Sequence, residues 1–292
     1  MNVVLFIYSC TLLATVAAAI PKEPFPFLLT YGGGALRHQG ERRRFGRSAL
    51  PPDSPYKWDK YQDESGNYVI PYVISGDYSP EEKKEIFAAM EKISKNTCVA
   101  FRSRSAEEDY VEIANIKYEG CSAYVGRFGG VSLLRLENGK YGCMGKRTIM
   151  QMLLHTVGLY HEHRRPDRDN FIKVHKENAI QDLSTHFQFA KLDPADVSTY
   201  NLPYDYTSIM HVGKDHYAES GKTTIETLDP AFQDVIGTLT EPSMYDYMKS
   251  GAAAFLHVQT PDLHIYYSEE FTPTSTEGRK QEVQDVEYVE DV

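Results

Sequence analysis

Apolar and polar positions in the first half of the chain predict a strand followed by a helix. Residues Tyr68–Ile74 form an apolar run rich in β-branched and aromatic side chains, which is typical of a strand. Ser79, Pro80 and Glu82 then have the pattern of a helix start with a capping box. Apolar residues recurring at helical spacing predict that this helix runs from Pro80 to about Lys95 and buries one face.

Further strands and one more helix are predicted downstream. The runs at 99–101, 110–114 and 131–136 have strand character, and a helix is expected from about Arg147 to Gly158. After it come many turns and little periodicity, up to about residue 258. The pattern therefore predicts an α+β domain whose C-terminal half is irregular.

The N-terminal residues 1–19 have the pattern of a secretory signal peptide. They are apolar and end in small residues, with Ala17 and Ala19 spaced as at a cleavage site. A membrane anchor is the alternative, but prolines follow from Pro21 and no later apolar run approaches ~20 residues. We therefore expect a secreted, extracellular protein without a membrane span.

The 292 residues carry a net charge of −10 and are 41% hydrophobic, which suits one packed domain of about 200 residues. The segment from 261 to 292 has nine acidic and two basic residues, so most of the net charge lies there. Low hydrophobicity and like charge predict that residues 259–292 form an acidic disordered tail. Nucleic acid is not expected as a partner.

A zinc-protease motif is present in altered form between Thr148 and His163. The full motif is H-E-x-x-H-x-x-G-x-x-H, in which two histidines four residues apart share a helix face and a glycine turns the chain toward the third. His155, Gly158 and His161 occupy the second, turn and third positions. Gln151 and Met152 stand where the first histidine and the catalytic glutamate belong.

The surrounding sequence resembles the astacin family of secreted metzincin zinc proteases. The resemblance rests on GLYHEHRRPDRDNFIKV (158–174) and YDYTSIMHVG (204–213), with weaker similarity from 68 to about 256. It implies a zincin-like fold of two subdomains around a cleft, with a twisted mixed sheet, an active-site helix and an irregular C-terminal half. Met210 would form the family's Met-turn beneath the metal histidines. The tyrosine that follows in the family, a metal ligand and transition-state donor, is Val212 here.

The resemblance also implies a division of the chain. Residues 20–47 would be a pro-segment, with Arg44–Arg47 as a basic processing site, and 48–258 the astacin-like domain. The family's short Phe-x-Gly-Asp inhibitory motif is absent from this sequence. A solvated basic linker is the alternative for 20–47. The resemblance also implies that Glu162 caps a buried water and salt network at the mature N-terminus.

Three cysteines remain once Cys10 leaves with the signal peptide. The resemblance implies a disulfide between Cys121 and Cys143. Cys98 would normally pair with a cysteine near the end of the domain, but no cysteine follows Cys143. Cys98 is then a buried thiol or an intermolecular partner.

The substitutions change the expected chemistry of the site. Gln151 offers only a neutral amide oxygen, so zinc binding should be weak or absent, with His155 and His161 as residual ligands. Structural histidines are the alternative for this pair. Met152 has no proton to give or take, and Val212 removes the hydroxyl that would stabilise the oxyanion.

Three hypotheses follow from these residues. The first is a non-catalytic pseudoprotease that binds an extended peptide or protein ligand in its cleft, along Val131–Leu136 as the edge strand. The second is a weakly active zinc-dependent endopeptidase in which Gln151 or His163 replaces the lost ligand. The third is a structural or decoy protein that associates through its acidic tail or Cys98. The metal content of the domain would separate the first two.

Overall fold

The computed structural model describes residues 28–31, 49–140, 142–181 and 187–255. The predicted signal peptide (1–19), the processing site and the acidic tail (259–292) lie outside the described residues. In the described ranges, every helix is too short or too polar to cross a bilayer.

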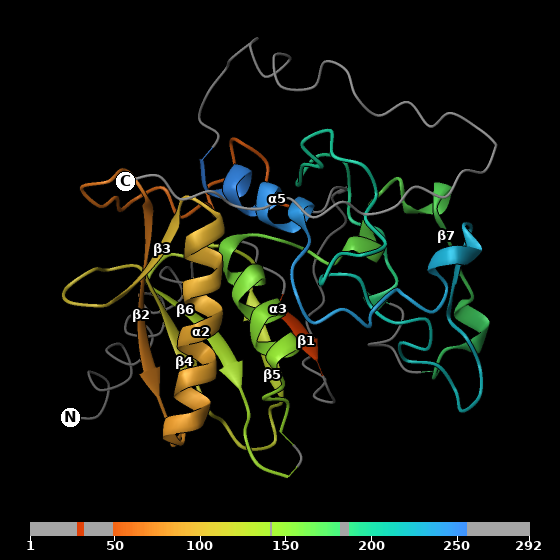
Figure 1. Cartoon of the computed structure of the whole chain (residues 1–292), viewed down its shortest axis with the longest axis horizontal. Helices are drawn as coiled ribbons and strands as arrows, with labels where there is room; N and C mark the ends of the chain where they lie inside the picture. Colours follow the sequence, from red (N-terminus) through yellow and green to blue (C-terminus); the bar gives the residue numbers. More distant parts are fainter. Residues whose placement is uncertain (1–27, 32–48, 141, 182–186, 256–292) are drawn as a thin grey trace, which may run out of the picture. The chain divides into compact units, whose positions relative to one another are not determined.

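A six-stranded mixed sheet occupies the first half of the domain (Figure 1). Its strands, in spatial order, are β1 (Leu28–Tyr31), β5 (Cys121–Tyr124), β6 (Val131–Leu136), β4 (Tyr110–Ala114), β2 (Tyr68–Ser75) and β3 (Val99–Ser103). Strands β6, β4, β2 and β3 run parallel, whereas β5 is antiparallel to β6 and β1 is antiparallel to β5. The expected mixed sheet and the four strands predicted from the apolar runs are confirmed.

The prediction that Val131–Leu136 is the edge strand is wrong. This strand, β6, pairs with β4 on one side and with β5 on the other, so both of its edges are already hydrogen-bonded to neighbouring strands. Strand β5 lies outside β6, and it pairs in turn with β1 in the register Leu28↔Tyr124 to Tyr31↔Cys121. The sequence did not reveal β5 because its four residues, CSAY, are too short and too small to form a period-2 pattern.

Helices α2 (Pro80–Asn96) and α3 (Lys146–Val157) lie side by side over one face of the sheet (Figure 1). The predicted capping box is present at the start of α2, where Glu82 N donates to Ser79 Oγ (3.2 Å) and Ser79 N donates to Glu82 Oε2 (2.8 Å). Apolar side chains from both helices pack with the sheet residues into the main core. Helix α3 is thereby fixed on the sheet, and the rest of the motif follows directly from its C-terminal end.

Helix α3 ends at Gly158, which has a positive φ of 129°. A side chain there would be strained, and its Cβ would come within 2.9 Å of Leu50. Gly158 N donates to the carbonyls of both Leu154 and His155, which closes the helix. The chain can therefore turn sharply and bring His161 back toward the end of the helix.

The second half of the domain has little regular structure, as expected, but it contains one helix that the sequence pattern did not predict. Its elements are η1 (Glu162–Arg164), η2 (Arg168–Asn170), β7 (Ile172–Val174), η3 (Lys176–Asn178), β8 (Ile225–Thr227), η4 (Pro230–Phe232) and α5 (Met244–Phe255). Helix α5 has a start signal in the sequence, because Ser243 and Asp246 cap one another in the manner of a capping box (both bonds 3.0 Å). A small second core around Phe189, Val212 and Ile225 holds this half together.

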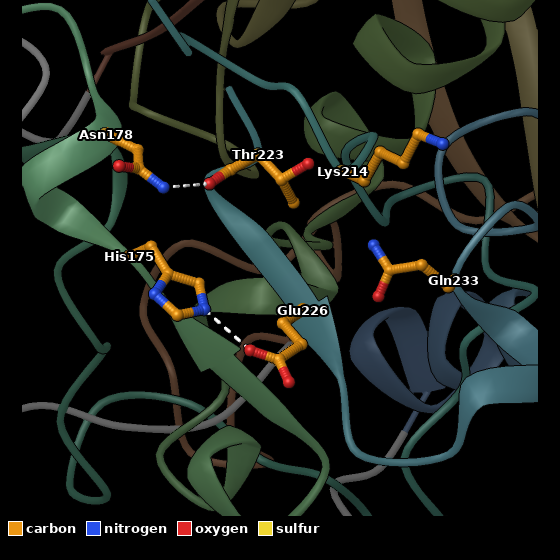
Figure 2. Close-up of a pocket in the computed structure, with 6 residues that line it drawn as sticks. All are labelled: His175, Asn178, Lys214, Thr223, Glu226 and Gln233. Atoms are coloured by element: carbon orange, nitrogen blue, oxygen red, sulfur yellow. Dashed lines mark hydrogen bonds and ion pairs between the residues drawn. The ribbon is translucent and has the colours of Figure 1, made fainter. Parts of the chain in front are cut away.

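A shallow pocket of about 380 Å³ lies beside the β7–β8 pair (Figure 2). His175 bonds there to Glu226 (2.7 Å) and Glu177 (3.1 Å), and these carboxylates raise the pKa of the His175 imidazole. Asn178 Nδ2 donates to the Thr223 carbonyl (2.8 Å). These lining groups bond to one another, and none of them belongs to the predicted active site.

Two of the three cysteines in the described residues form a disulfide within the first half of the domain, and the third is a free thiol. Cys121, the first residue of β5, forms a disulfide with Cys143, just before α3. Cys98 is a free, half-buried thiol whose Sγ lies 3.8 Å from the Gly251 carbonyl of α5, and burial raises the pKa of this thiol. The Cys98 thiol thus faces helix α5 of its own chain.

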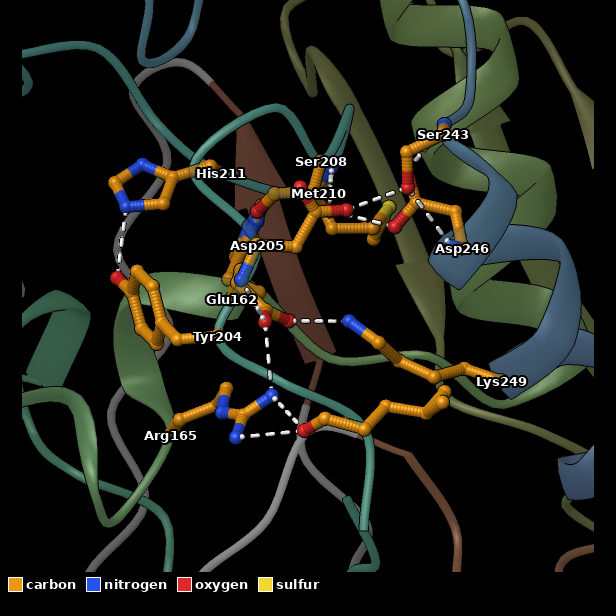
Figure 3. A network of polar contacts seen from close by, with 12 residues as sticks. Glu162, Arg165, Tyr204, Asp205, Ser208, Met210, His211, Ser243, Asp246 and Lys249 are labelled. Carbon is orange, nitrogen blue, oxygen red and sulfur yellow. Dashed lines mark hydrogen bonds and ion pairs between the residues drawn. The ribbon is translucent and has the colours of Figure 1, made fainter. Parts of the chain in front are cut away.

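A buried carboxylate links the motif to α5 (Figure 3). Glu162 Oε2 lies 2.6 Å from Lys249 Nζ of α5, and Glu162 Oε1 lies 3.1 Å from Arg165 Nη1. Asp205 N donates a third bond to Oε1 (3.1 Å). Glu162 and Lys249 are 0% and 1% exposed, so each charge depends on the other. The counter-ions of Glu162 among the described residues are therefore Lys249 and Arg165.

A second buried carboxylate, Asp246 of α5, holds the Met-turn (Figure 3). Ser208 Oγ donates to Asp246 Oδ1 (2.6 Å), and Ile209 N donates to Asp246 Oδ2 (2.9 Å). Met210 N donates to Ser208 Oγ (3.0 Å), and the Met210 side chain is buried in the main core. Helix α5 thus fixes both the segment after α3 and the turn that faces it.

Cys121→Ser is expected to lower the free energy of unfolding by about 3 kcal/mol, the loop-entropy value for a bridge spanning 22 residues. Cys98→Ala is the matched control, and it should cost about 1 kcal/mol or less because this thiol is only half buried. Urea denaturation measures both. Mass spectrometry without reductant should find Cys98 as a free thiol, and a Cys98-linked dimer as the main species would contradict the assignment.

Lys249→Met should lower the free energy of unfolding by about 3 kcal/mol or more, because it leaves Glu162 buried beside only one remaining cation. Lys222→Met is the control, since the exposed Lys222–Glu219 pair contributes about 0–1 kcal/mol. The double variant Lys249→Met with Glu162→Leu should recover part of the loss, since Glu162 is then no longer left unpaired. Equal urea midpoints for the two lysine variants would show that the buried pair contributes nothing.

Candidate active site

The active-site helix presents Gln151 and His155 one turn apart on one face. Both are buried, at 1% and 0% exposed, because α3 packs between the sheet and the second half of the domain. Gln151 Nε2 donates to the Ile209 carbonyl (2.7 Å), and His155 Nδ1–H donates to the Leu159 carbonyl (2.7 Å). The bond to Leu159 leaves His155 Nε2 as the nitrogen with the lone pair.

His161 meets this face from the segment beyond Gly158. Its Nδ1–H donates to the Met210 carbonyl (3.0 Å), so its Nε2 also carries the lone pair. The His155 and His161 rings are 4.7 Å apart between centroids and almost perpendicular, at 87°. Gln151 and His161 thus bond to the consecutive carbonyls of Ile209 and Met210. The structure brings together the three residues that the motif spacing placed in one site.

Burial keeps these imidazoles neutral at neutral pH. It lowers the pKa of His155 to about 4 and holds the pKa of His161 well below its ordinary value, with further lowering of His161 by the neighbouring His155 and His216. A neutral imidazole is the form that binds a metal ion.

The two other altered positions have become part of the packed interior. Met152 is 1% exposed and lies in the main core, and Val212 is 3% exposed and lies in the second core. The hydroxyl of Tyr204, from the same sequence block as Val212, donates to His211 Nε2 (2.8 Å). That hydroxyl is therefore already bonded and does not replace the missing tyrosine.

Three more histidines lie close to the site, and the motif did not predict their grouping. His163 is 5.3 Å from His161, 6.2 Å from His211 and 5.8 Å from His216 between ring centroids. His163 Nε2–H donates to the Gln188 carbonyl (3.0 Å). His211 and His216 come from the Met-turn and the segment after it, where the sequence shows only isolated histidines. His163 and His211 are buried and His216 is half-buried, and desolvation lowers the pKa of each ring.

The donor set differs from that of a three-histidine zinc site. Within the described ranges, no three His, Cys, Asp or Glu side chains are grouped so that they could hold a metal ion. Two imidazole lone pairs are present, and the third position holds an amide, whose Oε1 is buried without a hydrogen-bond partner. His155 Nε2 is buried without a partner as well. Gln151, His155 and His161 are therefore the residues that would hold a divalent metal ion here, with two nitrogen donors and one oxygen donor.

Comparisons with known proteins agree with this architecture. Residues 57–253 match the peptidase family Astacin. Zinc metalloproteinase nas-5 of Caenorhabditis elegans is 45% identical over 210 residues, 72% of this chain and 58% of that protein. Low choriolytic enzyme of Oryzias latipes is 34% identical over 198 residues, 68% of each chain.

A solved structure is similar over the same region. High choriolytic enzyme 1, a hatching enzyme zinc-protease from Oryzias latipes, aligns with a TM-score of 0.61 and 33% identity, covering 68% of this chain and 94% of that chain. The chain spans about half the length of three Caenorhabditis elegans zinc metalloproteinases that it matches. Because the family match covers most of the described domain, the chain belongs to the astacin family of metallopeptidases.

Proposed function

We propose that this protein is a secreted, non-catalytic member of the astacin family that binds an extended peptide or protein segment in its cleft. The observation that carries the proposal is the pairing of β1 with β5. Residues Leu28–Tyr31 add to the sheet in an antiparallel register along all four residues of β5. The outer edge of β5 therefore accepts an extended backbone, which is the mode of binding by strand addition.

This proposal moves the binding edge from Val131–Leu136 to Cys121–Tyr124. Strand β6 has no free side, whereas β5 has only β1 beyond it. The segment that supplies β1 precedes the basic run Arg42–Arg44 and Arg47. Cleavage within that run would separate β1 from the domain covalently and leave its place on β5 open to another peptide.

Two positions lack the groups that catalysis in this family would require. A positioned general base contributes about 10²- to 10⁴-fold to such reactions, or roughly 3–5 kcal/mol of barrier. Met152 has no basic atom and is packed in the core, so no rotamer change supplies one. Val212 lacks the hydroxyl that would stabilise the oxyanion, a further contribution of about 3–4 kcal/mol for one donor. Both losses act on the same transition state.

A weakly active zinc-dependent endopeptidase is the second candidate. It is favoured by the two neutral, inward-facing imidazoles of His155 and His161 and by relatives that are named zinc metalloproteinases. Zinc binding should be weaker than in a three-histidine site, because an amide oxygen replaces an imidazole. Assays for peptide cleavage separate the two candidates.

The proposal also covers the export of the protein and the processing of its N-terminal segment. We infer a signal peptide over 1–19, a leader over 20–47 that contains β1, the domain over 48–258 and an acidic tail over 259–292. The apolar start of the chain, the basic run before residue 48 and the charge of the tail support this division. The disulfide between Cys121 and Cys143 suits an oxidising, extracellular compartment.

The purified protein is expected to cleave no unfolded protein substrate, whereas Gln151→His with Met152→Glu should bind zinc tightly and regain partial activity. The double change restores the third imidazole and the base, but Val212 still lacks its hydroxyl. The assay is release of fluorescent peptides with and without chelator. Gln151→His alone is the control for metal binding without a base. Chelator-sensitive cleavage by the unaltered chain would instead favour the second candidate.

A fluorescent peptide copying residues 26–34 should bind at least ~5-fold more tightly to the double variant Leu29→Pro with Thr30→Pro than to the unaltered chain. Successive N–H groups of a strand alternate in direction, so one of two adjacent prolines removes a donor that faces β5 and weakens the internal strand. The control is the same pair of prolines at Gln39 and Gly40, outside β1. Equal peptide affinity in all three proteins, measured by fluorescence anisotropy, would exclude β5 as the binding edge.

A further inference from the structure

The orientation of the Gln151 amide is fixed by its surroundings. Its neighbour Ile209 offers a carbonyl, which can only accept, so the group at 2.7 Å must be the NH₂. The carbonyl oxygen Oε1 is therefore the atom that is left, buried and without a hydrogen-bond partner. A buried acceptor without a partner costs about 1–3 kcal/mol. Within the described residues no group donates to this oxygen, and a bound cation would remove that cost.

The two imidazoles are oriented in the same way, and one of them also has a buried acceptor without a partner. His155 Nδ1–H bonds to the Leu159 carbonyl and His161 Nδ1–H bonds to the Met210 carbonyl, so each ring turns an Nε2 lone pair away from its anchor. His155 Nε2 is buried without a partner. Gln151 Oε1 and His155 Nε2 are thus two buried acceptors for which the described part of the chain supplies no donor, and a cation satisfies such an arrangement.

The backbone brings these three acceptors to one place. Gln151 and His155 are four residues apart on α3 and share a face. Gln151 and His161 are anchored on adjacent carbonyls of the Met-turn, at Ile209 and Met210. The His155 and His161 rings are 4.7 Å apart in an edge-to-face arrangement. Each residue is therefore tied to the other two by the helix, by the turn or by direct ring contact.

From this geometry we propose that Gln151 Oε1 is the third ligand of a divalent transition-metal site completed by His155 Nε2 and His161 Nε2. Imidazole nitrogens with one neutral oxygen suit borderline ions such as Zn²⁺, Ni²⁺ and Co²⁺. The ion would act structurally, because it joins α3, the segment after Gly158 and, through the two carbonyl anchors, the Met-turn.

His163 is the competing third donor, because its Nδ1 is also buried without a partner. Its ring is 5.3 Å from His161, but it also contacts Phe189 (6.3 Å) and His216 (5.8 Å) on the side of the second core. Its anchor is the Gln188 carbonyl, not the Met-turn. The structure therefore assigns the ligand role to Gln151 and leaves His163 as a packed neighbour.

The experiment titrates the full secreted chain, freed of metal, with Zn²⁺ by calorimetry and with Co²⁺ by visible absorption. One Zn²⁺ should bind per chain. Gln151→Leu, which keeps the volume and removes the oxygen, should weaken binding at least ~10-fold. Gln151→Glu should strengthen it because a charged oxygen replaces the neutral one. In the Co²⁺ spectrum, both variants should change the ligand-field bands near the metal.

His163→Asn is the matched control, a buried histidine that should leave Zn²⁺ affinity within ~3-fold. His155→Ala should abolish binding. If Gln151→Leu fails to fold, Gln151→Glu still tests the assignment by the direction of its effect. Absence of Zn²⁺ binding, equal affinity of Gln151→Leu and the unaltered chain, or a larger loss in His163→Asn would each overturn it. Peptide capture on β5 is measured in chelator, so the two proposals can fail separately.

Discussion

The buried pairing of Glu162 with Lys249 is the interaction on which the second half of the domain depends. A carboxylate with no exposure must receive donors for nearly all of its acceptor sites, and here they come from Lys249, Arg165 and the backbone of Asp205. Arg165 lies three residues after Glu162, whereas Asp205 and Lys249 lie 43 and 87 residues after it, Lys249 in helix α5. Because Glu162 directly follows His161, closing this network also sets the position of the histidine. The need to pair the buried Glu162 carboxylate therefore positions both the second half of the domain and the candidate site.

The sequence predicted the elements that have a local signal and missed those that depend on partners. Helix α2 has a capping box and a periodic apolar face, and both are present as predicted. Strand β5 is four residues long and is stabilised mainly by its neighbours, so its residues have no pattern of their own. Helix α5 starts at a capping pair that could have been recognised at Ser243 and Asp246. Its buried lysine has, in the sequence, the character of an ordinary surface residue.

The site was predictable where spacing along one helix determines geometry. Motif spacing placed Gln151 and His155 on one face and His161 beyond the turn, and the structure has them together. It could not reveal that Glu162 pairs with a lysine 87 residues later. Nor could it reveal that β1 adds to β5, since strand pairing at long range depends on topology and leaves no periodic signal. Contacts between segments that are distant in sequence, such as these two, are visible only in the three-dimensional structure.

The three altered positions of the motif have not been altered in the same way. Met152 and Val212 are apolar, buried and packed in the two cores, so the interior has absorbed them at no polar cost. Gln151 is equally buried, but it retains a polar oxygen that no group of the described chain satisfies. A leucine of similar volume would avoid that cost, of about 1–3 kcal/mol. An amide at this position, beside two imidazoles held in the ligating tautomer, is accounted for if its oxygen binds a cation. Under the proposal made above, the polar group that remains at Gln151 is the one that would hold a metal, whereas Met152 and Val212 serve only to pack the interior.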